Sequence, residues 1–393
     1  MDLNYSAEDE AFRARVRGWL AGHAAEAKGV PPNPMAAVAH SRAWQCKMYE
    51  AGLVGIAWPS AYGGRDASPT QQVILGEELA RSGVPAPINS IGLGTLAPAL
   101  ILYGTEEQKR RFLPRMLTAA EIWCQGFSEP GSGSDLASLR TRAVVDGDDF
   151  VVTGQKVWTS LGPIADWCFI LVRTDADAPP QRGISYLLMD MKSPGLSTVP
   201  IRQITGKSHF SELFLEDVRI PRANLVGKQN EGWGVAKASL SFERSGLSSI
   251  VQLERTLYAV GRLAVSAGKR NDPIVRQRLA QLRIEMETLR YTGYRVLTQQ
   301  LRGASAGPEA AIGKLASSEF RQRLMELALD VQGPFAVLGR KNEHALDRGR
   351  WPGLYLDARA YTIGGGTSEV MRNIIAERAL GLPRSNSHGG GKE

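Results

Sequence analysis

The sequence predicts a multidomain α+β protein with an N-terminal all-α domain, a middle domain that forms an antiparallel β-barrel or sandwich, and a C-terminal four-helix bundle. Apolar residues recur at helical spacing through about the first 118 residues. From about Ile122 to Gln229, short β runs alternate with connections rich in Pro, Gly and Asp. Long amphipathic segments follow from Gly232 and favour a helix bundle. We therefore expect domains at residues 1–118, 119–229 and 230–384, with a polar, disordered tail at 385–393.

Length and composition are those of an ordinary globular protein. No apolar run reaches the roughly 18 residues of a membrane span, and the first residues lack the features of a signal peptide. We therefore expect a soluble, cytoplasmic protein. The formal net charge is +7, but Lys and Arg are interspersed with Asp and Glu. This pattern favours a solvated surface over a nucleic-acid-binding face.

The three cysteines argue against a disulfide framework and against a metal site. Cys46, Cys124 and Cys168 lack CxxC spacing, and the five histidines do not cluster with them. We expect buried free thiols and no bound metal.

Capping residues and prolines divide the N-terminal region into helices. Ser6 is expected to cap a first helix whose apolar positions include Phe12, Val16 and Leu20. Prolines at 31, 32 and 34 are expected to break the chain before a second helix around Trp44–Leu53.

The rest of this region is also predicted to be helical. A turn at Pro59–Gly64 precedes a helix through Leu75 and Leu79. The nearly apolar stretch Ile91–Leu102 is expected to be a buried helix. Thr105, with Gln108 three residues later, forms a capping box for a helix that ends near Met116.

The middle region begins with a predicted hairpin. Asp146–Asp149 has the composition of a turn between the apolar runs 143–145 and 150–152. A further strand is expected after Gly154, at Gln155–Ser160. Later strands are predicted at Trp167–Val172, Ile184–Met189 and Phe210–Ile220.

Amphipathic helices dominate the C-terminal region. The first is expected to carry one long apolar stripe, formed by Leu240, Leu247, Ile250, Leu257 and Val260. Further helices are predicted at Pro273–Leu301, Ala310–Val331 and Ser368–Leu380, the last stopped by Gly381 and Pro383.

One stretch, Cys124–Arg142, has a composition that packing does not explain. Pro130, Gly131 and Gly133 precede Ser134 and Asp135, so that backbone N–H groups and hydroxyls can approach an anion closely. Ser134 and Asp135 are expected to cap the next segment. An ordinary Gly/Ser turn is the alternative, and strand signals follow the loop where a dinucleotide fold would have a helix.

Three blocks in the same order resemble the acyl-CoA dehydrogenase family of flavoenzymes. They are EPGSGSD at Glu129–Asp135, GQKVWTS at Gly154–Ser160 and GGGTSEVMRNIIAERALGLPR at Gly364–Arg384. The resemblance implies an FAD cofactor, an acyl-CoA substrate and an electron-transfer flavoprotein as electron acceptor. It also implies α,β-dehydrogenation of the thioester to the trans-2-enoyl-CoA.

The resemblance assigns site residues by position. The expected FAD contacts are Phe127, Ser128, Ser134, Trp158, Ser160 and Thr367. Arg244 would lie near the CoA part of the substrate. Trp158 and Trp167 could both be core aromatics, and we keep that interpretation for Trp167.

The usual catalytic base of the family is missing. The position that holds a Glu in much of the family is Gly365 here, whose backbone N–H could still polarise the thioester. A minority of the family carries the base as a Glu before an Arg on the first bundle helix, which matches Glu243 and Arg244. Glu243 shares the spacing of the apolar stripe, and a dry cleft would raise its pKa. Alternatively, Glu243 is a solvated or ion-paired helix charge.

Two departures from the family pattern suggest a shared cofactor site. The segment expected to reach a neighbouring subunit's FAD, Ala267–Pro273, lacks its Phe and has a displaced Arg. Leu329–Gly333 keeps only part of the family's Gln-plus-Gly-Gly element. Chains with these gaps resemble one subunit of the actinobacterial α2β2 enzymes that act on steroid side-chain CoA thioesters, where a homologous subunit completes the FAD site. A homotetramer is the alternative.

Other readings of the sequence stay open. Gly364–Gly366 would leave room for a bulky acyl group, or would only make the backbone flexible before a helix. The chain could be a flavoenzyme of this fold that does not dehydrogenate, or a non-catalytic subunit of a heteromeric enzyme. A DNA-associated relative would need a contiguous basic face, which the sequence does not suggest.

Overall fold

The computed structural model describes residues 5–242, 247–302, 307, 310–340 and 342–383. The chain forms two compact units, residues 1–243 and 244–393. The fold is the predicted one: a helical N-terminal region, a β-sheet in the middle and helices at the C-terminal end. No helix in the described ranges is long and apolar enough to cross a bilayer.

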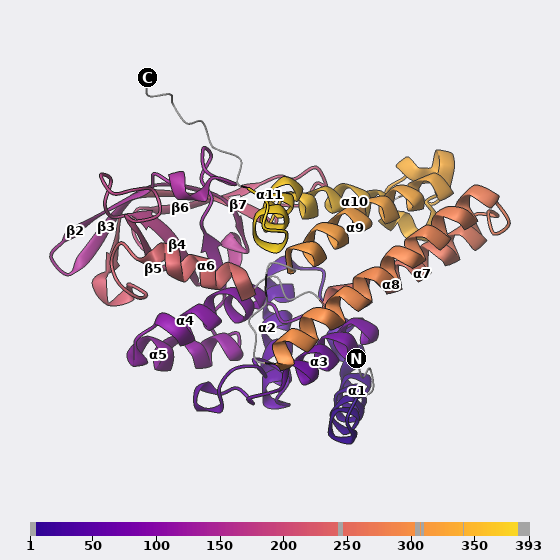
Figure 1. The fold of residues 1–393 in the computed structure, drawn as a ribbon, viewed down its shortest axis with the longest axis horizontal. Coiled ribbons are helices and arrows are strands. Elements are labelled where there is room, and N and C mark those ends of the chain that lie inside the picture. Colours follow the sequence, from indigo (N-terminus) through magenta and orange to yellow (C-terminus); the bar gives the residue numbers. More distant parts are fainter. Residues whose placement is uncertain (1–4, 243–246, 303–306, 308–309, 341, 384–393) are drawn as a thin grey trace. The chain divides into compact units, whose positions relative to one another are not determined.

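Among the residues that the structure describes, six α-helices belong to the first unit (Figure 1). Ser6 caps the first by accepting a hydrogen bond from the Asp9 N–H at 3.1 Å, as predicted. Thr105 and Gln108 form the predicted capping box. The helices are α1 (Ala7–Lys28), α2 (Pro34–Glu50), α3 (Pro69–Ser82), α4 (Ala97–Tyr103), α5 (Glu106–Leu117) and α6 (Gly232–Phe242).

Two helical predictions in this unit were wrong in detail. Pro34 begins α2, capped by Asn33, because proline lacks only an N–H that the first helical turn leaves unpaired anyway. The stretch Ile91–Leu102 is not uniformly buried. It consists of a π-helical turn, Gly92–Leu96, followed by α4, and Leu102 is 60% exposed near the end of α4.

Seven strands in the described part of the chain form one mixed sheet. Their order is β1-β4-β2-β3-β7-β6, and β5 pairs with β4. β1 and β2 run parallel to β4, and the other pairs are antiparallel. The strands are β1 (Trp123–Gly126), β2 (Arg142–Asp146), β3 (Asp149–Ser160), β4 (Trp167–Arg173), β5 (Ile184–Asp190), β6 (Leu196–Ile201) and β7 (Phe210–Pro221).

The predicted hairpin is confirmed, because Val145 pairs with Phe150 across the turn. The expected break at Gly154 is wrong: β3 continues through it, and the register shifts there by a bulge. At that point Gly154 has φ +155°, and a Cβ would approach Thr141 Oγ1 to 2.6 Å. The short strands β1 and β6 were not predicted.

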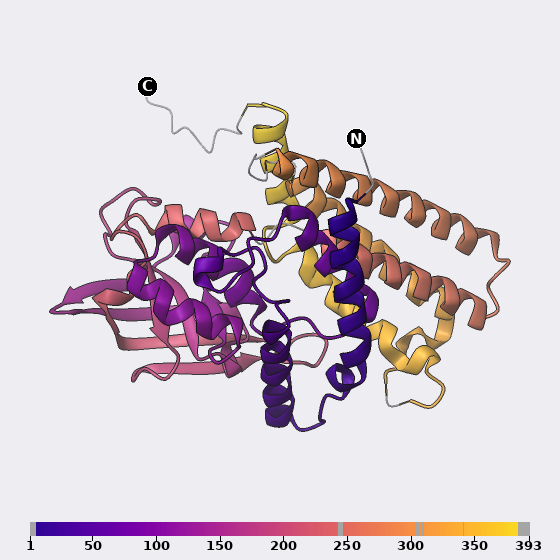
Figure 2. The same cartoon turned by 90° about the horizontal axis from the view of Figure 1, so that it is seen from below.

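Helices α4, α5 and α6 lie along one face of this sheet (Figures 1 and 2). Adjacent strand residues enter separate cores, since alternate side chains point to opposite faces. Trp123 packs with the helical core, whereas Cys124 packs with the apolar cluster on the other side of the sheet. Cys124 and Cys168 are buried free thiols, as expected, but Cys46 is only partly buried.

A buried amide network fixes the start of β1. The side-chain amide of Asn89 donates to the Met116 and Glu121 carbonyls at 3.1 and 3.0 Å, and its oxygen accepts from the Trp123 N–H at 2.9 Å. Gln45 also donates to the Met116 carbonyl and accepts from the Asn89 N–H. Together they satisfy the C-terminal end of α5 and position β1.

The second unit is a bundle of helices. α7, α8 and α9 pack against one another, and α10 and α11 pack on α9 (Figure 1). The sequence did not predict α10. Pro352 and Gly353 have the composition of a turn, but Pro352 lies in the first turn of α10, where a proline is tolerated. The helices are α7 (Leu247–Ser266), α8 (Pro273–Leu301), α9 (Ala310–Gln332), α10 (Arg350–Ala358) and α11 (Ser368–Ile374).

The expected single apolar stripe divides between two cores. Leu240, on α6, packs with the core of the first unit, whereas Ile250, Leu257 and Val260, on α7, pack with the core of the second. Residues 243–246 between the two helices lie outside the described residues, as does the expected tail at 385–393.

We predict that Asn89→Leu lowers the free energy of unfolding by about 3 kcal/mol, because it orphans the Glu121 carbonyl and the Trp123 N–H and removes one of the donors to the Met116 carbonyl. Urea unfolding followed by circular dichroism measures this loss. Gln72→Leu is the control, since its amide donates to the Ala67 carbonyl at the surface, and we expect a change within about 0.5 kcal/mol. Equal losses in both variants would contradict the role given to Asn89.

Candidate active site

The first unit brings two predicted cofactor segments together. The Val157 N–H, on β3, donates to the Ser128 carbonyl, just beyond the end of β1, at 2.9 Å. Phe127 and Ser128 therefore lie beside the end of β3, which carries Trp158 and Ser160.

Trp158 is held in an unusual conformation at the surface. Its side chain is 58% exposed, and its φ of +61° costs roughly 1–2 kcal/mol for a residue other than glycine. Its only described aromatic contact is an edge-on one with Phe210, with ring centroids 6.2 Å apart. Strain of this kind is often found at functional sites. Trp158 is therefore not a core aromatic, and its ring is available to a flat ligand.

Trp167 behaves differently and is a core aromatic, as expected. It stacks on Trp123 with ring centroids 5.5 Å apart and contacts the edge of Phe112. Phe127 is also buried, edge-on to Phe169 and Tyr186. The Phe127 ring thus packs in the core of this unit.

The Ser-Gly loop after Ser128 starts with a tight turn. Glu129 and Ser132 exchange two backbone hydrogen bonds of 2.9 and 3.0 Å. Gly131 and Gly133 do not use positive φ, but a Cβ on either would meet no atom within 4 Å, so the loop surface is open. Ser134 is exposed beside them.

The expected cap of the next segment by the Ser134 and Asp135 side chains is wrong. The next element is a short 3₁₀ turn, Leu136–Ser138, with no side-chain cap. The Asp135 carbonyl instead accepts from the Ser132 and Ser138 hydroxyls at 2.8 and 2.7 Å. These bonds fix the loop from within and leave the Ser134 hydroxyl without a described partner in this loop.

A buried ion pair lies under this loop. The Lys156 ammonium, fully buried on β3, donates to Glu129 Oε1 at 2.8 Å and to the Phe127 carbonyl at 3.1 Å. The same Glu129 carboxylate accepts from the N–H groups of Arg140 and Thr141 at 2.6 and 2.8 Å. One carboxylate and one ammonium thus connect β3 with the residues after β1 and with the chain just before β2.

Burial and pairing act in opposite directions on the pKa of Glu129. Burial by itself would raise it, but the Lys156 charge and the hydrogen bonds from Thr141 and Arg140 hold the pKa below its usual value. Burial lowers the pKa of Lys156, against the attraction of Glu129. The carboxylate is therefore a structural anion and not a general base.

The second unit contains the glycine loop of the predicted site. Gly365 and Gly366 have φ values of +67° and +96°. The Lys314 ammonium on α9 donates to the Gly366 carbonyl. Within the described part of the chain, the Gly365 N–H has no acceptor. This N–H is free to donate to a substrate oxygen.

Thr367 begins the next helix. Its hydroxyl caps α11 by accepting from the Val370 N–H at 3.2 Å. It borders a polar hollow of about 520 Å³, to which the neighbouring Ser368 also contributes. The Ser368 hydroxyl is buried and has no partner among the described residues. An orphaned hydroxyl in a polar hollow is compatible with a polar ligand group at this helix start.

The proposed base and the expected CoA contact, Glu243 and Arg244, lie outside the described residues. Both segments that depart from the family pattern make contacts within the second unit. Lys269 donates to the Asp330 carbonyl at 2.8 Å, and Asp272 caps α8. The buried Gln332 amide donates to the Ala328 carbonyl of its own helix.

Sequence reasoning missed the roles of Lys156, Glu129 and Lys314. For Lys156 a signal existed, because simple alternation along β3 puts this lysine on the same side as apolar Phe150 and Val152. A buried lysine implies a buried anion. No local signal pointed to Lys314, which meets Gly366 only through the fold.

We predict that Lys156→Met lowers the free energy of unfolding by about 3–5 kcal/mol, since it leaves the Glu129 carboxylate buried without its cation. The double variant Lys156→Met/Glu129→Gln should recover part of the loss. Chemical unfolding of the three proteins measures both effects. In the control, Lys47→Met breaks a half-exposed pair with Glu26 and should change stability by at most about 1 kcal/mol. A Lys156→Met protein as stable as the Lys47→Met control would contradict this role.

Known protein families match the chain along nearly its full length. Models of the acyl-CoA dehydrogenase N-terminal, middle and C-terminal domains match residues 6–120, 124–218 and 230–380. The chain is 42% identical to the acyl-CoA dehydrogenase IpdE1 of Mycobacterium tuberculosis in an alignment of 389 positions that covers 95% of this chain and 98% of that protein.

Two solved heteromeric structures are similar in fold. The steroid ACAD Tcur3481-Tcur3483 has a TM-score of 0.86 and 30% identity, and the match covers 98% of this chain and 100% of that one. The ChsE4-ChsE5 complex from Mycobacterium tuberculosis has a TM-score of 0.84 and 33% identity, with coverage of 98% and 100%. On its three domain matches and its close relatives, the chain belongs to the acyl-CoA dehydrogenase family.

Proposed function

We propose that the chain is one subunit of an FAD-dependent acyl-CoA dehydrogenase that converts a steroid side-chain acyl-CoA thioester to its trans-2-enoyl-CoA. An electron-transfer flavoprotein is the proposed electron acceptor, and the proposed compartment is the cytoplasm. The substrate class is supported by similarity to a protein described as a steroid ACAD. The reaction is supported by membership of the family.

The observation that carries the proposal is the exposed, strained Trp158 beside Ser128. Its ring, the Ser128 and Ser160 groups and the backbone around Phe127 would contact the flavin ring, and Ser134 the pyrophosphate. Thr367 would also contact the flavin. These groups suit FAD, because a flat ring needs an aromatic surface and a pyrophosphate needs hydroxyl and N–H donors. Bound FAD supplies the hydride acceptor at its N5 atom.

Two groups of the chain would act on the thioester. The Gly365 N–H, without an acceptor among described residues, would donate to the thioester oxygen and acidify the α-proton. Glu243 would then remove that proton. A side chain at position 365 would also need the left-handed φ that glycine adopts there without strain. The left-handed backbone at position 365 therefore supports placing the catalytic base on another element.

We expect Glu243→Gln to keep the fold and bound flavin but to lower turnover by a factor of about 10³ or more, because the amide cannot accept the α-proton. Reduction of an electron acceptor by acyl-CoA measures turnover, and the flavin spectrum confirms cofactor content. Glu231→Gln, an exposed substitution just before α6, is the matched control. Near-normal turnover of Glu243→Gln would remove the base assignment and would favour a non-catalytic subunit or another flavin reaction.

We also expect the chain purified alone to be poor in flavin and to become yellow only when co-expressed with a homologous subunit. The reason is that Lys269 and Gln332, in the two departing segments, make contacts within their own unit. Flavin absorbance together with native mass tests this. One FAD per chain in a homotetramer would instead show that the site needs no second polypeptide.

A further inference from the structure

The glycine loop Gly364–Gly366 has few interactions that hold it in place. Gly365 and Gly366 have positive φ values, which glycine adopts without strain. Glycine also loses more conformational freedom than any other residue when the chain is ordered. The residue before the loop gives little support, because the Ile363 side chain is 66% exposed. The direction of the Gly365 N–H therefore depends on the hydrogen bonds that the loop and its two ends make.

Backbone hydrogen bonds fix the two ends of this loop. The Gly364 N–H donates to the Ala360 carbonyl at 2.8 Å. On the other side, the Met371 N–H donates to the Thr367 carbonyl at 2.9 Å, in the first turn of α11. Neither bond reaches the peptide units on either side of Gly366, so the middle of the loop needs a separate anchor.

Lys314 supplies that anchor. Its half-buried ammonium, on α9, donates to the Gly366 carbonyl from 52 residues away in the sequence. Within the described ranges, the Gly364 and Gly365 carbonyls accept no hydrogen bond. Because a peptide unit is planar, the Lys314 bond fixes the plane that joins Gly366 to Thr367. Only the torsions of Gly365 and Gly366 separate this plane from the Gly365 N–H.

The same helix also holds the turn before the loop. The side-chain amide of Gln322 donates to the Thr362 hydroxyl at 2.7 Å, and its oxygen accepts from Arg359 at 2.9 Å. Lys314 and Gln322 are eight residues apart, slightly more than two helical turns, so both lie on the same side of α9. α9 therefore supports the chain before and after Gly365, and Lys314 makes the contact that is closer in sequence to that N–H.

We propose that Lys314 is a positioning residue: by fixing the Gly366 peptide plane, its ammonium aims the Gly365 N–H at the thioester oxygen. The inference rests on the proposed function, in which this N–H polarises the thioester. An N–H donor stabilises the oxygen most when negative charge develops on it as the α-proton leaves. Misplacement of the N–H therefore slows the reaction more than it weakens substrate binding.

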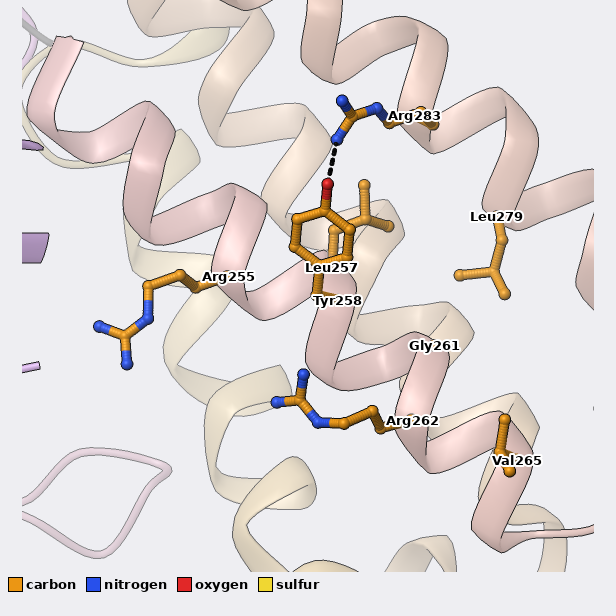
Figure 3. Close-up of a pocket in the computed structure, with 8 residues that line it drawn as sticks. All are labelled: Arg255, Leu257, Tyr258, Gly261, Arg262, Val265, Leu279 and Arg283. Atoms are coloured by element: carbon orange, nitrogen blue, oxygen red, sulfur yellow. Dashed lines mark hydrogen bonds between the residues drawn. The ribbon is translucent and has the colours of Figure 1, made fainter. Parts of the chain in front are cut away.

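Another hollow of this unit supplies a control residue. It measures about 590 Å³ and lies between α7 and α8 (Figure 3). There Arg283 donates to the Tyr258 hydroxyl at 2.9 Å and to Glu254 at 3.0 Å, and it also pairs with Glu287. These described partners all belong to α7 or α8. Loss of the Arg283 charge therefore weakens contacts of the bundle without removing a bond to the glycine loop.

The test uses the flavin-loaded protein, together with a homologous subunit if flavin binding requires one. The turnover probe is the CoA thioester of a steroid with a saturated acyl side chain. The second probe is its 3-oxo analogue, whose enolate is followed by absorbance. We expect Lys314→Met to lower kcat about 10- to 100-fold, and to lower the enolate-to-ketone ratio of the bound analogue by a similar factor. The Kd of the enoyl-CoA product should change less than about 3-fold.

Graded variants separate the hydrogen bond from the charge. Lys314→Arg keeps both a donor and a positive charge and should recover part of kcat. Lys314→Gln keeps a neutral donor and should give a kcat between those of Lys314→Met and the unmodified protein. Arg283→Met should leave kcat and the enolate ratio unchanged, even where it lowers Tm. If circular dichroism shows that Lys314→Met is unfolded, Lys314→Gln carries the test, with a loss of at least about 3-fold in both readouts.

Unchanged kcat and enolate ratio in the Lys314 variants would overturn the inference and leave the proposed function intact. An equal loss in Arg283→Met would also overturn it, because the effect would then come from a weakened bundle. The same holds for a loss confined to Kd, since Lys314 would then support binding only. A flavin-loaded unmodified protein that neither oxidises the thioester nor forms the enolate would overturn the proposed function, and the inference with it.

Discussion

The candidate site in the first unit depends on one buried ion pair, Glu129 with Lys156. Removing both charges from water is costly, and such a pair is rarely a net source of stability. Its value is geometric. The carboxylate binds two successive N–H groups before β2, and the ammonium binds the Phe127 carbonyl after β1. No apolar substitute could satisfy these three backbone groups at once, so the pair specifies where the Ser-Gly loop leaves the sheet.

The same pair explains why Trp158 can keep a strained backbone. A left-handed tryptophan persists only where its neighbours are fixed. Lys156 is anchored by its ammonium two residues earlier, and the Val157 N–H is bound to the Ser128 carbonyl. Thr159, the residue after Trp158, is fully buried. The ring is thus held at the surface by constraints on both sides, which is the preorganisation that a flavin site requires.

Local signals carried the sequence predictions that succeeded. The caps at Ser6 and Thr105 and the turn at Asp146–Asp149 depend on neighbouring residues, so each could be read directly. The predictions that failed needed tertiary information. Gly154 looks like a break unless β7 beside it is known, and Pro352 looks like a stop unless α9 is there to pack on. The positions of Trp158 and Ser128 were assigned by resemblance, whereas the ion pair that joins their segments links residues 27 apart. A short stretch of sequence read by itself therefore cannot reveal this pair.

The loss of a carboxylate at position 365 and the departures at two other segments have a common physical consequence under the proposed function. Each removes a group that a self-sufficient enzyme would supply. The polar side chains present in the two departing segments are occupied within their own unit: Lys269 donates to the Asp330 carbonyl, and Gln332 donates to the Ala328 carbonyl. These side chains would have to break existing hydrogen bonds before they could serve a cofactor. In contrast, the Gly365 N–H and the Ser368 hydroxyl have no partner among the described residues. Under the proposed function, the donors without a partner would meet substrate and cofactor. A second subunit would supply the cofactor contacts that the occupied side chains cannot make.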